Sequence, residues 1–242
     1  MVTINSAFYK ENGYYLHKKQ LFTQDKLDNL SAIFDELSST GGLRTDEYDT
    51  PHFSDKRLLD LLRSDEALDM VEQLIGPNIG LWSSHFISKE PFVGRRTPWH
   101  EDSSYWNGRF DRLDQIVTIW LAIDNSTLEN GCMGVVPGTH KNGFSEYHNV
   151  DTQTNTFGLE IKAEQVELEK VVWFELNKGE CSTHDGRIIH GANANTSPKR
   201  RCGYTMRYFS LDMKLDKDHP GNKNHKIFWC RGENIGDNPL IY

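Results

Sequence analysis

Hydrophobic residues recur at helical spacing in the first third of the chain. After Thr23, apolar side chains fall three or four positions apart, as on one face of an amphipathic helix: Leu27, Leu30, Ile33, Phe34 and Leu37. Thr23 is the expected N-cap, because its hydroxyl can accept a hydrogen bond from a backbone N–H of the first turn. Similar spacing predicts helices over 57–62 and 66–75, and 13–16 is expected to be a short extended stretch.

The pattern changes at Ile79, after which short apolar runs alternate with turn residues, as is typical of β-structure. The expected strands cover 79–88, 116–123, 132–136, 171–176, 180–183 and 202–211. The polar segment 147–158 is expected to be a loop or lid. We predict one domain over 1–242, with a helical part at about 1–77, a sheet sandwich or barrel at about 78–215 and an irregular segment at 216–242.

The composition indicates a soluble globular domain and excludes several functions. With 242 residues, 37% of them hydrophobic and 26% charged, the chain can bury a core without disulfides or a structural metal. The net charge of −8 argues against a nucleic-acid binder, and no apolar run reaches the roughly 18 residues of a membrane span. We therefore expect a small molecule as the partner, with no nucleic acid and no membrane.

Four widely spaced cysteines and the N-terminus bear on the cellular compartment. The cysteines form no C-x-x-C pair, so a zinc ribbon or a thioredoxin motif is excluded and free thiols are expected. The first residues contain no basic segment followed by an apolar core, so no signal peptide is predicted. Both observations favour the cytoplasm.

The densest group of potential metal ligands is the segment 97–102, T-P-W-H-E-D. On a strand, residues i and i+2 project from the same face, so His100 and Asp102 can bind one ion. A histidine from another strand would complete two histidines and one carboxylate on one side of the metal. That arrangement suits ferrous iron, with positions left for a chelating cosubstrate and dioxygen. Taken alone, an H-x-D pair is more often a surface pair without a metal.

Two downstream histidines compete for the third ligand position. His184 and His190 both lie in the segment 181–191, C-S-T-H-D-G-R-I-I-H-G. His190 follows an apolar pair and precedes a glycine, as at the end of a strand that lines a cavity. The histidine that is not a ligand is expected to be a hydrogen-bonded core residue.

Arg201 is a candidate for binding an acidic cosubstrate. It follows His190 across the turn 191–199, and an antiparallel return strand would bring it near the metal. Its planar guanidinium group matches a carboxylate, so it can hold one end of a dicarboxylate whose other end chelates iron. The spacing alone also permits a solvated charge within the basic run 199–201.

Several segments, in order, resemble the phytanoyl-CoA dioxygenase family of iron- and 2-oxoglutarate-dependent oxygenases. The matching segments are W-H-E-D at 99–102, the apolar strand with the E-N-G-C turn at 116–133, V-P-G-T-H at 136–140, and H-G-A at 190–192 with Asn195 and Arg201. The glycine and tyrosine at 13–14, followed by a helix, also match. The resemblance covers about 5–210, and the set is far more specific than any one motif.

The resemblance implies a fold, a cofactor and a set of ligands. The fold would be mainly β with flanking α-helices, around a double-stranded β-helix (jelly-roll, cupin-like) core. Fe(II) would bind His100, Asp102 and His190, and Arg201 would hold the distal carboxylate of the cosubstrate 2-oxoglutarate. Dioxygen would be the oxidant.

Three further residues match family positions near the cosubstrate, namely Lys89, Trp106 and Trp120. Lys89 is otherwise an exposed lysine, and the two tryptophans are otherwise core residues. Related halogenases replace the metal-binding carboxylate by a small residue, so the presence of Asp102 favours oxygenation over halogenation.

The resemblance makes the protein a 2-oxoglutarate-dependent dioxygenase, with hydroxylation of an unactivated C–H bond as the default reaction. The basic surface expected for a coenzyme A phosphate is not evident, so a small polar metabolite is favoured, such as an amino acid, a compatible solute or a natural-product intermediate. The candidate substrate residues are Trp82, His85, Tyr105, Arg44 and Arg95. Two alternatives stay open: a jelly-roll binding module without turnover, and a hydrolase with zinc on the same ligands.

Overall fold

The computed structural model describes residues 3–40 and 42–242 of the chain. The α-helices of these residues are α1 (Ser6–Asn12), α2 (Gln24–Ser39), α3 (Lys56–Leu62), α4 (Asp65–Ile75) and α5 (Asp102–Trp106). The helices predicted from spacing are confirmed as α2, α3 and α4. The hydroxyl of Thr23 accepts a hydrogen bond from the backbone N–H of Lys26, so Thr23 is the N-cap of α2.

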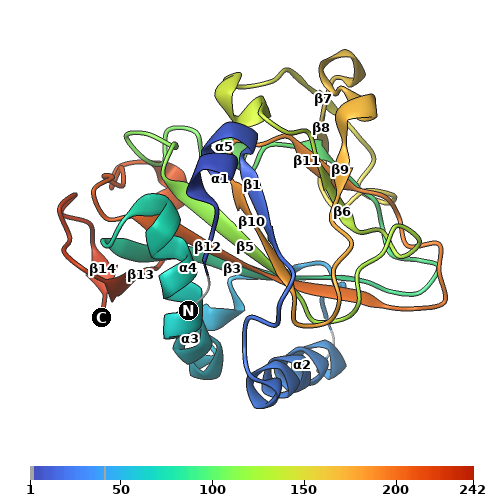
Figure 1. Ribbon diagram of the computed structural model, residues 1–242, viewed down its shortest axis with the longest axis horizontal. Helices are drawn as coiled ribbons and strands as arrows, with labels where there is room; N and C mark the ends of the chain where they lie inside the picture. Colours follow the sequence, from blue (N-terminus) through green and yellow to red (C-terminus); the bar gives the residue numbers. More distant parts are fainter. Residues whose placement is uncertain (1–2, 41) are drawn as a thin grey trace.

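Most of the strands form one large sheet, in the order β1-β10-β5-β12-β3-β13-β14, with β2 also paired to β3 (Figure 1). Its strands are β1 (Tyr14–His17), β2 (Tyr48–Asp49), β3 (Ile79–Lys89), β5 (Ile116–Ala122), β10 (Cys181–Asp185), β12 (Arg201–Ser210), β13 (Ile227–Arg231) and β14 (Leu240–Ile241). All neighbours are antiparallel except the pair β13–β14.

A smaller sheet faces the large one. Its order is β4-β11-β6-β9, from β4 (Thr97–His100), β6 (Met133–Val135), β9 (Val172–Trp173) and β11 (His190–Ala192). Trp120 of the large sheet and Val135 of the small sheet belong to one buried apolar cluster, which joins the two layers. Two facing, mainly antiparallel sheets with helices on one side confirm the predicted mainly β fold.

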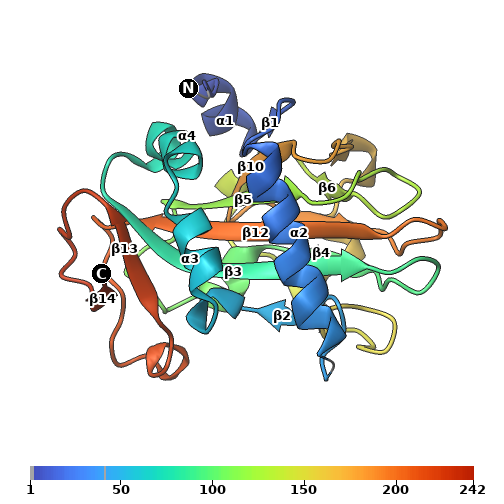
Figure 2. The same cartoon turned by 90° about the horizontal axis from the view of Figure 1, so that it is seen from below.

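Alternation along the strands gives the large sheet two different faces. On β5, Val117, Ile119 and Leu121 pack with residues of α2, α3 and α4 in the main core, and these helices lie across that face (Figure 2). Thr118 and Trp120 point the other way, into the space between the sheets. The strand sequence therefore separates a structural face from a face that can carry chemistry.

Two segments differ from the prediction. The end of the chain is not irregular throughout, because β13 pairs with β3 and extends the large sheet. Asp218 and His219 lie in a turn and Pro220–Asn222 form one turn of 3-10 helix, but Ile227 and Phe228 begin a buried apolar run in β13. The segment 147–158 begins with β7 (Tyr147–Asn149), which forms a hairpin with β8 (Leu159–Ile161) above the small sheet.

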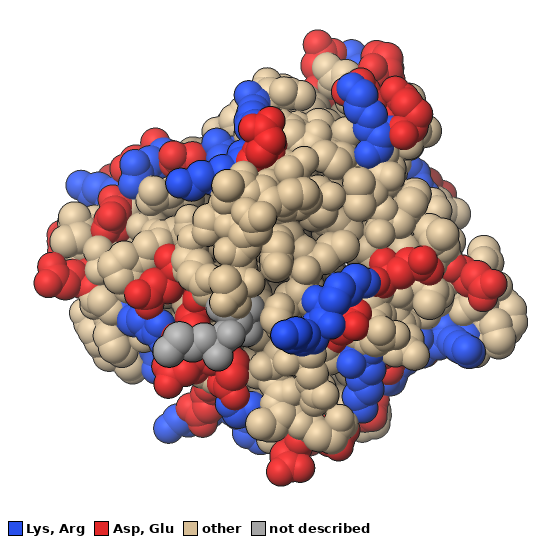
Figure 3. All heavy atoms as spheres, viewed as in Figure 1, with Lys and Arg blue, Asp and Glu red and all other residues tan. Residues whose placement is uncertain are grey.

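The predictions about membrane spans, surface charge and cysteines can be compared with the structure. None of the helices in the described residues is long and apolar enough to cross a membrane. On the face shown in Figure 3, acidic and basic side chains are interspersed around a broad uncharged area. All four cysteines are buried and free, as predicted.

Candidate metal centre and the two cavities that meet there

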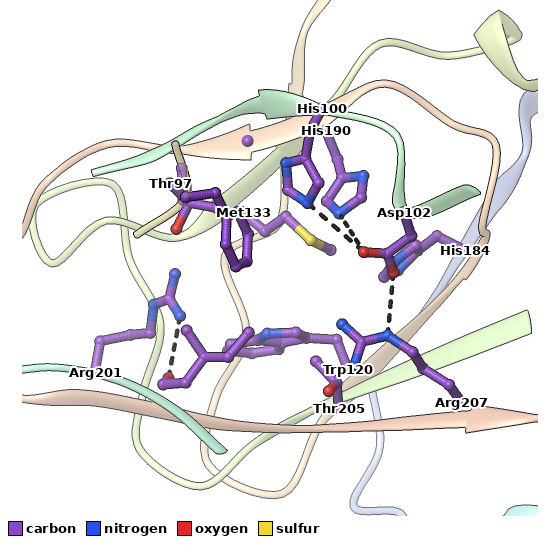
Figure 4. A pocket seen from close by; sticks show the side chains of 14 residues that line it. Thr97, His100, Asp102, Trp120, Met133, His184, His190, Arg201, Thr205 and Arg207 are labelled. Atoms are coloured by element: carbon purple, nitrogen blue, oxygen red, sulfur yellow. Dashed lines mark hydrogen bonds and ion pairs between the residues drawn. The ribbon is translucent and has the colours of Figure 1, made fainter. Parts of the chain in front are cut away.

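Two histidines and one carboxylate come together where the small sheet meets α5. His100 ends β4 and His190 begins β11, and the two residues lie opposite each other in the antiparallel pair. Asp102 is the first residue of α5. All three side chains are buried, with ligand atoms within 4.8 Å of one another; Oδ1 of Asp102 is 3.6 Å from Nε2 of His100 and 4.0 Å from Nε2 of His190 (Figure 4). This donor set fits a divalent first-row metal ion.

Both imidazole rings are held in the tautomer that a metal requires. Nδ1–H of His100 donates to the Pro98 carbonyl at 2.8 Å, and Nδ1–H of His190 donates to the Ile188 carbonyl at 3.0 Å. Since a carbonyl only accepts, Nδ1 carries the proton and Nε2 is free to bind the ion. Burial, and secondly the neighbouring His100, lowers the pKa of His190 well below its usual value, which keeps this ring neutral.

Asp102 is ionised although it is buried. Burial by itself raises the pKa of this carboxyl group, but Arg207, His100 and His190 together outweigh burial and hold the pKa well below its usual value. Nε of Arg207 donates to Oδ2 of Asp102 at 3.2 Å, so Oδ1 remains for the metal. An ionised carboxylate and neutral imidazoles are the protonation states in which these side chains bind metals.

The path between the first two ligands differs from the prediction. The H-x-D spacing predicts one extended segment, but β4 ends at His100 and α5 begins at Asp102. The intervening Glu101 is buried, and its carboxylate accepts hydrogen bonds from the hydroxyl groups of Ser145 and Tyr147, both at 2.6 Å. These bonds tie the turn at Glu101 to the β7–β8 hairpin, and Asp102 reaches the ligand group from the start of a helix.

Of the two competing histidines, His190 joins the ligand group and His184 does not. The His184 ring lies 5.0 Å from the His190 ring and lines the same cavity. It is not the hydrogen-bonded core histidine that the sequence predicts, because neither ring nitrogen has a hydrogen-bond partner in the described part of the chain. Burial lowers the pKa of His184 to about 4, so this ring is neutral.

Arg201 lies at the other end of the cavity that contains the ligand group (Figure 4). It is 2% exposed, and its Nε and Nη2 donate to the Gly131 carbonyl at 3.0 and 2.6 Å. Its guanidinium carbon lies 5.1 Å from the ring centre of Trp120. Burial lowers the pKa of Arg201 to about 10, which leaves it charged at neutral pH.

The charge of Arg201 has no carboxylate partner among the described residues, since its hydrogen bonds all go to backbone carbonyls. A buried cation without a counter-charge is unfavourable unless an anion binds beside it. The cavity therefore fits a molecule that chelates the metal at one end and presents a carboxylate to Arg201 at the other.

The three other residues expected near the cosubstrate occupy different places. Trp120 lines this cavity beside Arg201. Lys89 is buried next to Arg201 but lies outside the lining, because its Nζ donates to the carbonyls of 192–193 at 3.4 and 2.6 Å. Trp106 lines a second cavity instead.

The second cavity, of about 380 Å³, adjoins the first. Asp102, Phe157 and Arg207 line both cavities, so the two spaces meet at the ligand group. Of the five residues predicted to contact substrate, three line the second cavity: Trp82, His85 and Tyr105.

The remaining two, Arg44 and Arg95, lie outside this lining. Arg95 forms a two-pronged ion pair with Asp46, at 2.6 and 3.0 Å, and donates to two carbonyls of the segment 152–155. Arg44 is exposed and reaches Gln153 at 3.4 Å. Both arginines hold the β7–β8 connection against the turn before β2.

Arg207, Phe157 and Arg109 are among the cavity residues that sequence reasoning misses. Arg207 could have been predicted from the sequence, because it lies six positions after Arg201 on the same strand and therefore projects from the same face. Phe157 and Arg109 have no such signal, since each reaches its cavity from a connection rather than from a strand.

Comparison with known proteins gives one family. The family model "Phytanoyl-CoA dioxygenase (PhyH)" matches residues 9–203. A phytanoyl-CoA dioxygenase domain-containing protein 1 homolog of Caenorhabditis elegans is 29% identical over 160 residues, which are 64% of this chain and 55% of that protein. The chain spans about half the length of the first curated relatives it matches.

Solved structures share the fold. The non-haem monooxygenase ThoJ, without ligand, has a TM-score of 0.79 at 20% identity, over 98% of this chain and 87% of that one. EvdO2 from Micromonospora carbonacea var. aurantiaca, complexed with 2-oxoglutarate, has a TM-score of 0.72 at 23% identity, over 90% of this chain and 95% of that one. The double-stranded β-helix core is therefore that of known oxygenases.

Proposed function

The chain belongs to the phytanoyl-CoA dioxygenase family, and from that premise we propose that it is an Fe(II)- and 2-oxoglutarate-dependent dioxygenase. It hydroxylates an unactivated C–H bond of a small polar metabolite. One observation carries the proposal: a ligand group of two histidines and one carboxylate shares a buried cavity with an arginine that lacks a carboxylate partner among the described residues.

Each residue of the first cavity has a role in this reaction. His100, Asp102 and His190 would hold Fe(II). Arg201 would bind the distal carboxylate of 2-oxoglutarate, with Trp120 beside its guanidinium. When bound, iron and 2-oxoglutarate supply oxidation of a C–H bond by dioxygen, coupled to the release of succinate and carbon dioxide.

The rest of the chain positions and protects these groups. Backbone carbonyls fix both imidazole rings, and Arg207 orients Asp102. Met133 and Phe157 line the cavity with apolar surface, which excludes water from the site of oxidation. The second cavity, which reaches the same ligand group, receives the substrate. The protein acts in the cytoplasm, where its four buried thiols stay reduced.

Two alternatives make different use of the same residues. A zinc hydrolase can use the three ligands, but it gives no role to the buried charge of Arg201. A binding module without turnover would keep the cavities and lack the reaction. Dependence on 2-oxoglutarate separates the first alternative from the proposal, and succinate formation separates the second.

The test is succinate formation from 2-oxoglutarate. The protein is loaded with Fe(II) without oxygen and then exposed to air, in the presence of small polar candidate substrates. We expect succinate from the native chain and none from a His100→Ala control. Iron binding without succinate, across all candidates, would support the binding module, and zinc-dependent hydrolysis without 2-oxoglutarate would support the hydrolase.

A further inference from the structure

The second cavity is lined by an arginine, Arg109, that has no role in the proposed binding of iron and 2-oxoglutarate. Arg109 follows α5 and lines this cavity. Its Nε donates to Oδ1 of Asn222 at 2.7 Å and its Nη2 donates to the Gly221 carbonyl at 2.6 Å. Its guanidinium carbon lies 4.4 Å from the ring centre of Trp82. These contacts hold the side chain in one position.

All hydrogen-bond acceptors of Arg109 are neutral. No carboxylate of the described residues forms an ion pair with it, and Nη1 makes no hydrogen bond there. Asn222 is itself fixed, because its amide donates to the carbonyls of Arg109 and Asp216 at 2.9 and 2.8 Å. Arg109 is therefore a rigid, partly buried cation with one donor group left for a ligand.

Arg207 provides a second cation in the same lining. Its Nε is joined to Asp102, and its terminal nitrogens have no acceptor in the described part of the chain (Figure 4). Its guanidinium carbon lies 5.7 Å from the ring centre of Trp106. The rings of Trp106 and Trp82 meet edge to face, with centres 6.3 Å apart, so one aromatic wall supports both arginines.

The acidic residues of this cavity neutralise these two charges only in part. Asp46 and Glu47 are both paired with Arg95, at 2.6 and 3.1 Å. Asp49 is exposed and makes no ion pair within the described residues; its negative charge favours the charged form of Arg109, but burial has the larger effect and lowers the pKa of Arg109. Asp102 would be shared between Arg207 and the metal.

We propose that the second cavity selects its substrate by an oxyanion, either a carboxylate or a phosphorus oxyacid group, which binds Arg109 and is supported by Arg207. This inference rests on the proposed function, which makes this cavity the substrate site. A substrate recognised as a cation on an aromatic cage is disfavoured, because a guanidinium group already lies over each tryptophan. An ammonium group of an amino acid can still face Asp49 at the rim.

The test compares acids with neutral and cationic partners of the same size. The probes are a series of amino acids with their carboxamides, methylphosphonate with its dimethyl ester, and choline. Binding is measured by thermal shift and by calorimetry on the native chain, as purified and after loading with Ni(II) and 2-oxoglutarate. We expect at least one acid to bind at millimolar concentration while its neutral partner does not. Preference for carboxylates or for the phosphonate identifies the source of the oxyanion.

Variants locate the binding to Arg109. Arg109→Gln is expected to weaken the binding of the acid about tenfold or more, since a charge-assisted contact is lost. Arg109→Lys keeps the charge without the planar fork, so its affinity for the acid is expected to lie between those of the native chain and Arg109→Gln. Residual binding by Arg109→Lys would also show that the weaker binding is not caused by loss of folding. Arg112→Gln is the matched control, because Arg112 is nearby, 43% exposed in its side chain and, among the residues that the structure describes, paired only with Asp114 and Gln115.

Three outcomes overturn the inference: no acid of the series binds, neutral partners or choline bind as well as the acids, or Arg109→Gln binds the acid like the native chain. The proposed function fails separately, when succinate is not formed from 2-oxoglutarate. Because binding is also measured without metal, an Arg109-dependent acid site can be found in either case.

Discussion

The two cavities that meet at the ligand group are built in different ways. In the first, Arg201, Trp120 and His190 all lie on strands, and each is held by backbone or ring contacts within the two sheets. In the second, Trp82 and His85 lie on strand β3, but Arg109, Thr156 and His225 come from connections between elements. Strands position side chains more rigidly than connections do, and connections vary more between relatives.

This difference suggests a division of labour within one site. The strand-built cavity suits the part of the reaction that is always the same, which is binding of the metal and of 2-oxoglutarate. The connection-built cavity suits the part that changes, which is the choice of substrate. Variants that act on one cavity or on both test this division.

The largest effect is expected from the ligand group at which the two cavities meet. Replacing His190 by Ala should abolish metal binding and reduce succinate formation to the level measured without enzyme, because two ligands do not hold the ion. His184→Leu is the control, since His184 lines the same cavity but stands outside the ligand group. Metal content after dialysis checks both. Retention of iron by His190→Ala and its loss from His184→Leu would reverse the assignment.

Arg201→Ala should affect the first cavity alone. We expect KM for 2-oxoglutarate to rise roughly 100-fold, because a buried, charge-assisted contact is worth about 1.5–3 kcal/mol. Arg201→Lys keeps the charge without the planar fork, so its KM for 2-oxoglutarate should lie between those of the native chain and Arg201→Ala. Initial rates of succinate formation against 2-oxoglutarate concentration give KM. An unchanged KM in Arg201→Ala would show that Arg201 does not bind the distal carboxylate of 2-oxoglutarate.

Gly203→Ala tests how closely the strand-built cavity is packed. A Cβ atom at Gly203 would lie 2.1 Å from the Trp120 ring, so the ring must leave its present position beside Arg201. Overpacking of this kind costs about 1–3 kcal/mol in the free energy of unfolding, and KM for 2-oxoglutarate should rise as well. Gly158→Ala in the β7–β8 connection is the control, with its nearest atom at 3.4 Å. Urea denaturation gives the free energy of unfolding of both variants. Equal stability would contradict the close packing of the first cavity around Trp120.

The sequence predicts the strand-built cavity far better than the connection-built one, for physical reasons. The expected antiparallel return from His190 to Arg201 is wrong as a strand pairing, because β11 lies in the small sheet and β12 in the large sheet, yet both residues line the first cavity. A period of two along a strand puts alternate residues on one face. The same rule would have found Arg207. The choice of His190 over His184 also depended on the family motif, because both are buried strand residues near the ligand group.

The connection-built cavity depends on contacts between distant segments. Arg109 is placed by Asn222, more than a hundred residues further along the chain. Arg95 has the charge expected of a substrate residue, but Asp46 neutralises it. The turn at Glu101, between the ligands His100 and Asp102, is held by a hydrogen bond from the distant Tyr147, which no local sequence pattern shows. These residues have ordinary spacing, and only the folded chain decides which of them face the cavity.

Tyr147→Phe should give the smallest effect, confined to the connection-built side. The variant removes a hydroxyl group that donates to the Glu101 carboxylate at 2.6 Å and accepts from the Glu101 backbone N–H at 3.2 Å, while the Ser145 hydroxyl still donates to the same carboxylate. We expect the free energy of unfolding to fall by about 1 kcal/mol. KM for 2-oxoglutarate should stay at the native value, because Arg201 and Trp120 make no hydrogen bond or ring contact with β7 or β8 in the described part of the chain. Tyr15→Phe, whose hydroxyl makes no hydrogen bond within the described residues, is the control for urea denaturation. Phe157 of the β7–β8 connection already packs on His100 at the ligand end of the first cavity. A rise in KM for 2-oxoglutarate in Tyr147→Phe would mean that the hairpin also acts on the Arg201 end, and that the two cavities are not independent.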